Sequence, residues 1–227
     1  MKTKILLIML IAVTVLSGLV GCSTINFSPG PDGPIDPQGE LGPSSEIAID
    51  IESTDVLVEI EYPLSGFTEI AVSDLFEVEI RQGEAYHVLV EAEETITPYH
   101  DITVRGKTLH IGLNSNYTYN IEGTRQRVEV TLPALTGVRV SDFSTVILED
   151  FEAEEGLQVD VADFSTLSGS IIAGVVGVEV TNHSELTLRG SASQVRGEVT
   201  DFSDADLKDL DAPEVKIDTD SHSTLID

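Results

Sequence analysis

The feature that most restricts the fold of this chain is a short internal repeat in its C-terminal part. Each copy places two aliphatic residues two positions apart, then Asp or Asn, an aromatic ring, Ser and another small or aliphatic residue. The copies occupy residues 138–146, 159–167, 178–186 and 197–205, with a weaker fifth copy at 217–225. Their starts differ by 21, 19, 19 and 20 residues. A period near 20 with a strand-like pattern predicts a solenoid, in which each copy buries its apolar face against its neighbours.

The rest of the chain after residue 46 alternates between apolar and polar residues. Alternation predicts strands with one buried face, and we expect such strands within 47–51, 76–80, 88–92, 102–104, 109–113 and 128–132. The sequence Arg105-Gly106-Lys107 between two of these predicts a hairpin turn. No segment after the N-terminal leader has a sustained helical period.

These patterns predict an all-β fold. We expect a right-handed parallel β-helix with rungs of about 20 residues over 138–227, preceded by mixed or antiparallel β strands over 46–137. A propeller is disfavoured because one blade needs about 40 residues. A sandwich is disfavoured because its strands do not repeat their sequence so closely.

The charge of the chain excludes some partners. It has 40 acidic and 12 basic residues, for a net charge of -28. Because binding to phosphates needs a basic surface, we expect no nucleic-acid partner and no unaided docking to an anionic membrane. The acidity is either an adaptation for solubility or a means of attracting a cationic partner. An apolar content of 41% still allows a core.

The first 21 residues predict an export signal, because Lys2 and Lys4 precede an apolar run over 5–16. The run leads into Leu19-Val20-Gly21-Cys22, which resembles the bacterial lipobox. The resemblance implies cleavage before Cys22 and a diacylglycerol on its thiol, and therefore a membrane partner through the lipid anchor. The expected cellular location is then the outer membrane in a Gram-negative cell, or otherwise the outer face of the cell membrane. Cys22 is the only cysteine, so no intramolecular disulfide forms.

Residues 22–45, which begin with the lipidated Cys22, are predicted to form a tether. Residues 23–45 hold five prolines and four glycines without an apolar period. This composition predicts an extended and mobile linker between the anchor and the β domain.

The repeats carry candidate site residues. Stacking of rungs about 4.8 Å apart places the acidic or amide residues beside a row of rings. The set is Asp142, Phe143, Asp163, Phe164, Asn182, His183, Asp201 and Phe202. One interpretation is a strip for Ca²⁺ or another ligand, since Ca²⁺ takes carboxylate oxygens. The other is that Asp and Asn form turns while the rings fill space. We expect the repeated Ser144, Ser165, Ser184, Ser203 and Ser223 to satisfy backbone groups of these turns.

Signatures of enzymes are missing from the sequence. It has no His-Glu-x-x-His, Gly-x-Ser-x-Gly or phosphate-cradling loop. His183 and His222 fall two rungs apart, too far to share one zinc ion. We therefore expect no enzymatic activity, no metal centre and no resident cofactor.

The order of the segments resembles the GIN-domain family of "putative auto-transporter adhesin" head domains. The resemblance rests on Gly66-Phe67-x-x-Ile70-x-Val72, 76–83, 88–92, 102–104, 108–111, Leu132-Pro133-x-Leu135 and the Ser-bearing repeats. The family has no established functional residues to carry over. Its repeats usually hold Gly-Ala where this chain has Asp-Phe or Asn-His, and its domain usually continues to an end containing Tyr and Gly.

The sequence thus predicts a lipid-anchored, extracytoplasmic interaction module that is adhesin-like and non-enzymatic. The alternative hypothesis is a structural or sensory envelope lipoprotein without an external ligand. A third hypothesis is a glycan-active β-helix enzyme. Because the sequence stops at Asp227, two residues after Leu225, we also expect self-association through an uncapped last rung.

Overall fold

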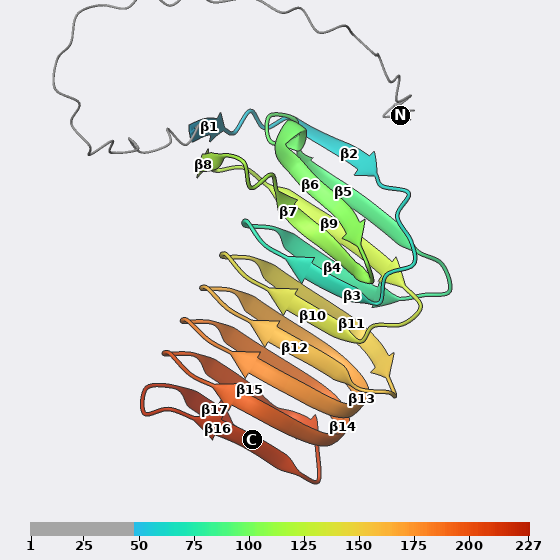
Figure 1. Cartoon of the computed structure of the whole chain (residues 1–227), viewed down its shortest axis with the longest axis vertical. Coiled ribbons are helices and arrows are strands. Elements are labelled where there is room, and N and C mark those ends of the chain that lie inside the picture. Colours follow the sequence, from blue (N-terminus) through green and yellow to red (C-terminus); the bar gives the residue numbers. More distant parts are fainter. Residues whose placement is uncertain (1–47) are drawn as a thin grey trace, which may run out of the picture. The chain divides into compact units, whose positions relative to one another are not determined.

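The computed structural model describes residues 48–227, which are built almost entirely from strands (Figure 1). The strands are β1 Ala48–Glu52, β2 Leu57–Glu61, β3 Glu69–Val72, β4 Glu77–Gln82, β5 His87–Glu93, β6 His100–Arg105, β7 Thr108–Leu113, β8 Thr118–Glu122, β9 Gln126–Leu132, β10 Gly137–Val140, β11 Thr145–Ala153, β12 Leu157–Val161, β13 Thr166–Val180, β14 Glu185–Val199, β15 Asp204–Asp211, β16 Val215–Thr219 and β17 Thr224–Ile226. Within this range the one helical element is the single 3-10 turn η1, Thr97–Tyr99. The predicted leader, Cys22 and the tether lie outside the described residues.

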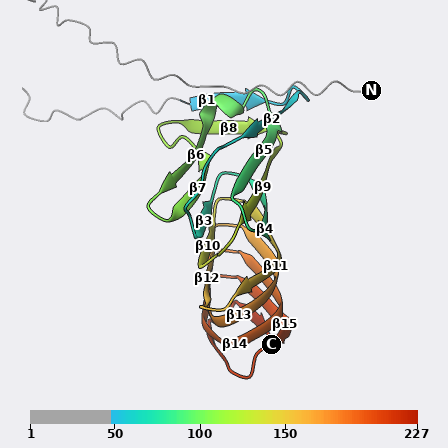
Figure 2. The same ribbon diagram turned by 90° about the vertical axis from the view of Figure 1, so that its right-hand side faces the viewer.

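The repeats form two stacks of parallel strands. Stack one contains β3, β10, β12, the second halves of β13 and β14, and β16. Stack two contains β4, β11, the first halves of β13 and β14, β15 and β17. The long strands β13 and β14 pass from one stack into the other, and a 90° turn of the view shows the stacks facing each other (Figure 2).

The register between rungs follows the sequence repeat. Val138 pairs with Val159, Val159 with Val178, and Val178 with Gly197. Equivalent residues of successive copies therefore stand directly above one another. The inward residues of both stacks make the core, because alternation buries every second side chain. In β9, for example, Val128 and Val130 are buried while Arg127 and Glu129 are exposed.

The N-terminal strands make the sheet a mixed one. β5 pairs antiparallel with both β2 and β9, and β9 then runs parallel to β4. β6 pairs antiparallel with β7 across the predicted hairpin at Gly106, and β7 runs parallel to β3. β1 and β8 form a separate parallel pair. The expected all-β fold is confirmed as a curled mixed sheet, whereas the right-handed β-helix stays a prediction.

One rung of the stack was not foreseen. β3 and β4 pair in parallel with β10 and β11, with partners 68 residues apart such as Ile70 with Val138. The parallel stacking therefore starts before residue 138, within the region expected to hold only mixed or antiparallel strands. Residues 83–136, which include the antiparallel pairs β5–β9 and β6–β7, are interposed in the sequence between β4 and β10, so a search at a period near 20 cannot detect this rung.

The described residues, 48–227, belong to one compact unit. In the part of the chain that the structure describes, no helix has the length and apolar character needed to cross a membrane.

Candidate functional site

The copies of the repeat share a turn that joins stack one to stack two. At four of these turns two successive residues have positive φ angles, all between 55° and 63°: Asp142 and Phe143, Asp163 and Phe164, Asn182 and His183, Asp201 and Phe202. This left-handed conformation is unfavourable for most L-residues, and Asp and Asn tolerate it best. The acidic and amide residues of the repeat are therefore placed where a turn former is needed.

The turns are joined to one another by backbone hydrogen bonds. The N–H of Phe143 donates to the carbonyl oxygen of Asp163 at 3.0 Å, and that of Phe164 to Asn182 at 2.9 Å. The N–H of His183 donates to the carbonyl of Asp201 in the same way, at 2.9 Å. The row of turns is thus a rigid continuation of the sheet around its corner.

The serines of the repeat lie on the inner side of the same turns, as the sequence indicates. The N–H of Ser144 donates to Ser165 Oγ at 3.2 Å, and the series continues through Ser184, Ser203 and Ser223. Ser144 Oγ, at the first turn of the series, has no hydrogen-bond partner among the described residues; Phe76 occupies the matching place on the rung before it. Ser144, Ser165, Ser184 and Ser203 are buried and Ser223 is half-buried, so the serines have a structural role in the turns.

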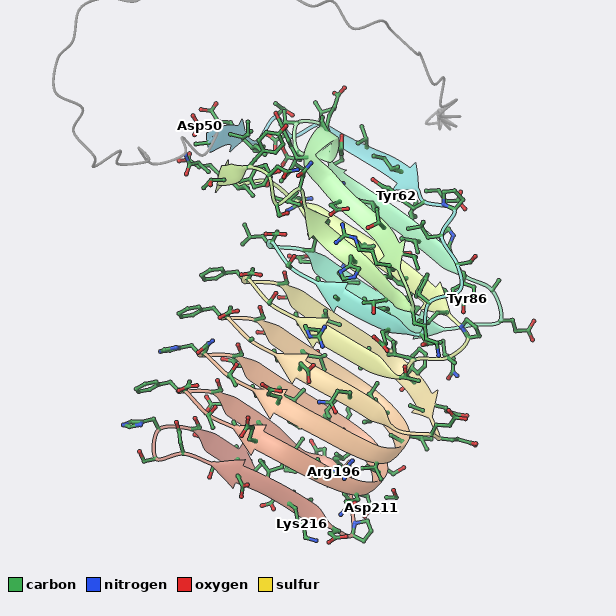
Figure 3. All side chains as sticks on the ribbon, in the orientation of Figure 1. Asp50, Tyr62, Tyr86, Arg196, Asp211 and Lys216 are labelled. Atoms are coloured by element: carbon green, nitrogen blue, oxygen red, sulfur yellow. The ribbon has the colours of Figure 1, made fainter. Side chains whose placement is uncertain are left out.

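The rings that follow the turn formers make a continuous row on the outside. We call Phe143, Phe164, His183, Phe202 and His222 the aromatic ladder. Neighbouring ring centroids lie 5.1, 4.9, 5.1 and 4.7 Å apart, with interplanar angles of 5°, 13°, 12° and 32°. Planar side chains project from successive turns at the left of Figure 3. The three phenylalanines are 53–60% exposed, which is unusual for side chains of this size.

The carboxylates beside the ladder are held by neutral donors. Ser141 Oγ donates to Asp142 at 2.8 Å, and Asn182 Nδ2 donates to Asp163 Oδ1 at 3.0 Å. The amide of Asn182 thus stands between the carboxylates of Asp163 and Asp201 along the row, and reduces the repulsion expected for an unbroken acidic series.

The last turn is stabilised differently from the others. Asp220 accepts from the N–H groups of Asp201 and His222, each at 3.0 Å. These donors and the Ser223 hydroxyl lower the pKa of Asp220 to about 2, the N–H of Asp201 having the largest effect. Asp220 is therefore ionised at any physiological pH.

The row of left-handed turns extends one rung further than the sequence suggested. Leu75 has a φ of 67°, follows Asp74 with a φ of 63°, and donates its N–H to the carbonyl of Asp142 at 3.0 Å. Its side chain is 45% exposed, next to the end of the aromatic row. The signal was the sequence Ser73-Asp74-Leu75, which matches Ser141-Asp142-Phe143 except for the ring.

The structure gives no metal site at the ladder. Among residues 48–227, no group of three or more His, Cys, Asp or Glu side chains is placed to hold a metal ion. The φ angles show that Asp and Asn are turn formers, while the proposed Ca²⁺ strip stays a prediction. His183 and His222 lie on opposite sides of Phe202.

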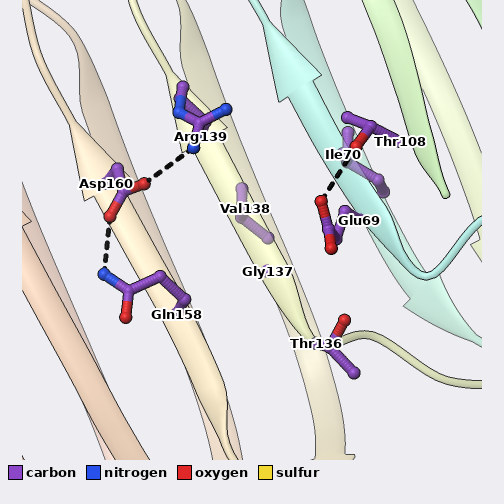
Figure 4. A pocket seen from close by; sticks show the side chains of 9 residues that line it. All are labelled: Glu69, Ile70, Thr108, Thr136, Gly137, Val138, Arg139, Gln158 and Asp160. Atoms are coloured by element: carbon purple, nitrogen blue, oxygen red, sulfur yellow. Dashed lines mark hydrogen bonds and ion pairs between the residues drawn. The ribbon is translucent and has the colours of Figure 1, made fainter. Parts of the chain in front are cut away.

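The surface also has shallow hollows on the outer faces of the strands. One of about 200 Å³ lies over β3, β10 and β12 (Figure 4). Its polar side chains are occupied with one another: Arg139 with Asp160 at 3.2 Å, Gln158 with Asp160 at 2.7 Å, and Thr108 with Glu69 at 2.8 Å. The aromatic ladder differs from these hollows, because it exposes three large apolar side chains on its row of turns.

These features define the class of the protein as a curled, repeat-built β domain with an external row of stacked rings. The chain belongs to the family described as "Putative auto-transporter adhesin, head GIN domain", whose model matches residues 66–226. The family is described by adhesion and not by an enzymatic reaction. No curated protein sequence matches the chain.

Solved structures share this fold. A "Putative lipid binding protein" from Parabacteroides distasonis ATCC 8503 aligns with a TM-score of 0.58 and 14% identity, over 78% of this chain and 96% of that one. A "putative adhesin" from the same organism aligns with a TM-score of 0.51 and 16% identity, over 75% of this chain and 81% of that one. At these identities the similarity concerns the fold alone.

Proposed function

We propose that this protein is a lipid-anchored, adhesin-like interaction module of the cell envelope, and that it binds an extended partner through the aromatic ladder. The observation that carries the proposal is the exposure of Phe143, Phe164 and Phe202 on successive rungs. Exposing apolar rings in a row costs solubility, and such patches mark interaction sites on soluble surfaces. The family description as adhesin head domains supports the same reading.

A binding role also agrees with the chemistry of the remaining surface. The polar groups of the hollow in Figure 4 bond to one another, and the repeated serines support backbone groups. Neither arrangement leaves a nucleophile or an acid–base pair directed at a substrate. We infer that the protein is not an enzyme.

The proposal also includes the lipid anchor and the right-handed coiling of the two stacks. Lipidation at Cys22, followed by the Pro- and Gly-rich segment 22–45, would hold the β domain away from the lipid surface. We further infer that the two parallel stacks coil as a right-handed β-helix, because connections between parallel strands are almost always right-handed.

The localisation is tested by protease shaving of intact cells that carry a tagged full chain, with lysed cells as the control. We expect release of the β domain from intact cells. Protection until lysis would place it in the periplasm and would favour an envelope scaffold or sensor. In the same cells Cys22→Ala should abolish the mass shift of lipidation and release the protein from the membrane. A variant that stays membrane-bound would contradict the anchor.

Binding through the ladder is tested by photo-crosslinking in intact cells. A benzophenone amino acid replaces Phe164 in the ladder or, as the control, Lys107 in the exposed β6–β7 turn. We expect a discrete crosslinked product from position 164 and none from position 107. Equal products from both positions, or none from position 164, would contradict the ladder as the binding surface.

A further inference from the structure

The orientation of the rings restricts what the ladder can bind. Phe143, Phe164, His183 and Phe202 are stacked with interplanar angles of 5–13°, so each ring covers the face of the next. The outward surface therefore consists of ring edges. A sugar ring or a cation that needs an open aromatic face finds one only at the ends of the row.

The charge around the ladder selects the sign of the partner. Asp142, Asp163 and Asp201 each precede a ring, and no Lys or Arg occurs in the ladder segments 141–144, 162–165, 181–184, 200–203 and 220–223. The ring edges carry partial positive charge, which suits the adjacent carboxylates. The result is an apolar ridge with an acidic border. A second copy of this chain, with a net charge of -28, would be repelled, whereas a cationic partner would be attracted.

The spacing of the rings selects the backbone of the partner. The first four rings repeat every 4.9–5.1 Å. An extended strand lying along the ridge presents side chains on one face about every 6.6–6.8 Å and loses register within two rungs. An α-helix presents a side chain of one stripe about every 5.4 Å, within about 0.5 Å of the ring spacing.

We propose that the aromatic ladder binds a cationic amphipathic α-helix of the partner. Its aliphatic stripe lies across the ring edges, and the Lys or Arg residues beside that stripe face Asp142, Asp163 and Asp201. Leu75 lengthens the apolar ridge at its N-terminal end. The inference rests on the proposed function and adds the class of partner to it.

The probe is a synthetic Leu/Lys peptide of about 18 residues, or five helical turns, with Leu on one face. A peptide of the same composition with Leu and Lys strictly alternating serves as the strand-period control. Affinities are measured by calorimetry for the full chain in nanodiscs of zwitterionic lipid, with empty nanodiscs as the blank. We expect the helix-period peptide to bind at least tenfold tighter than the strand-period peptide, and to weaken as salt rises.

Variants assign the binding to the ladder. Phe143→Ser/Phe164→Ser/Phe202→Ser should lower the affinity for the helix-period peptide at least tenfold. Asp142→Asn/Asp163→Asn/Asp201→Asn should lower it and reduce its salt dependence. The matched control Ile147→Ser/Ile172→Ser changes exposed aliphatic residues on outward strand positions and should leave the affinity unchanged. If the triple serine variant does not fold, Phe164→Ser and Phe202→Ser are measured singly.

The outcomes separate the two proposals. Equal binding of the two peptides, or equal losses in the ladder and control variants, would overturn the helical partner. A crosslink from position 164 in cells under those results would leave the proposed function standing with a partner of another class. Absence of both the peptide preference and the crosslink would overturn both proposals.

Discussion

The backbone N–H of Ser165 donates to the hydroxyl oxygen of Ser184 on the next rung, 3.3 Å away. Both serines are buried. The bond belongs to a series in which Ser165, Ser184, Ser203 and Ser223 each accept from the rung before, so a side chain replaces a backbone carbonyl at the corner of the sheet. Because a buried N–H without a partner is costly, this small hydroxyl decides whether the corner is stable.

Replacing one serine of the series should therefore destabilise the whole domain. We expect Ser184→Ala to lower the free energy of unfolding by about 1–3 kcal/mol, since the N–H of Ser165 is left buried and unpaired. Ser193→Ala, at an exposed position of β14, is the control and should change it by less than about 0.5 kcal/mol. Urea unfolding curves measure both. Similar losses in the two variants would show that the hydroxyl bond is not the cause.

The left-handed turn at Phe164 predicts a difference between two substitutions that both remove the ring. Its φ is 61°, a region that Asn tolerates and that β-branched Val does not. We expect Phe164→Val to be less stable than Phe164→Asn by about 1–2 kcal/mol. Thermal and urea unfolding of the pair would reveal this difference. A Val variant as stable as the Asn variant would rule out backbone strain at this position.

Close approach of two rungs predicts the effect of a methyl group at Gly190. Its φ is 109°, and an added Cβ would lie 2.1 Å from the carbonyl oxygen of Ile171. We expect Gly190→Ala to prevent folding or to lower the melting temperature strongly. Gly106→Ala is the control, because φ is 66° there but the space is open; it should cost about 1–2 kcal/mol from backbone strain alone. A Gly190 variant no worse than the Gly106 variant would contradict the close approach.

Burial of His100 predicts a dependence of stability on pH. Neither ring nitrogen has a protein partner with hydrogen-bond geometry in the described part of the chain. Burial lowers the pKa of His100 to about 4, with the nearby Gln126 amide opposing the shift. Since the unfolded chain binds this proton near pH 6.5, the free energy of unfolding should rise from pH 4 to 6.5, by up to about 3 kcal/mol. Below pH 4 His100 is protonated in both the folded and the unfolded chain, so this gain in the free energy of unfolding is absent.

The pH effect is measured as a difference between variants, because carboxylates also titrate in the lower part of this window. Urea unfolding from pH 4 to 7 should give a shallower rise for His100→Phe than for the native chain. Ser193→Ala, at an exposed position and without a titratable side chain, should keep the native profile. Identical profiles for all three proteins would refute the assignment to His100.

The turn geometry predicts that Ca²⁺ does not stabilise the domain specifically. Asp142 and Asp163 already accept hydrogen bonds from Ser141 and Asn182. We therefore expect the melting temperature in millimolar Ca²⁺ to equal that in Mg²⁺ at the same ionic strength, since both ions only screen the acidic surface. A shift with Ca²⁺ well beyond that with Mg²⁺ would restore the Ca²⁺ interpretation.

The sequence by itself determined the parts of this protein that depend on local pattern. Alternation of apolar residues predicted strands with one buried face, and the repeat of Val138, Val159 and Val178 predicted which residues stack. The sequence also indicated that Asp and Asn beside Phe and His form turns, because tolerance of the left-handed conformation is a property of single residues. The sequence also predicted that the serines point inward, because each is two positions before an aliphatic residue of the same strand face.

Only the tertiary structure decided which distant segments pair and which ring surfaces remain open. Ile70 joins the stack beside Val138 across 68 residues, a pairing that alternation allows but does not specify. The sequence put Phe143 and Phe164 in one row, but their nearly parallel stacking, which leaves edges outward, depends on the φ angles of two adjacent turns. The low pKa of His100 likewise follows from burial by residues far away in the sequence, because desolvation depends on three-dimensional packing.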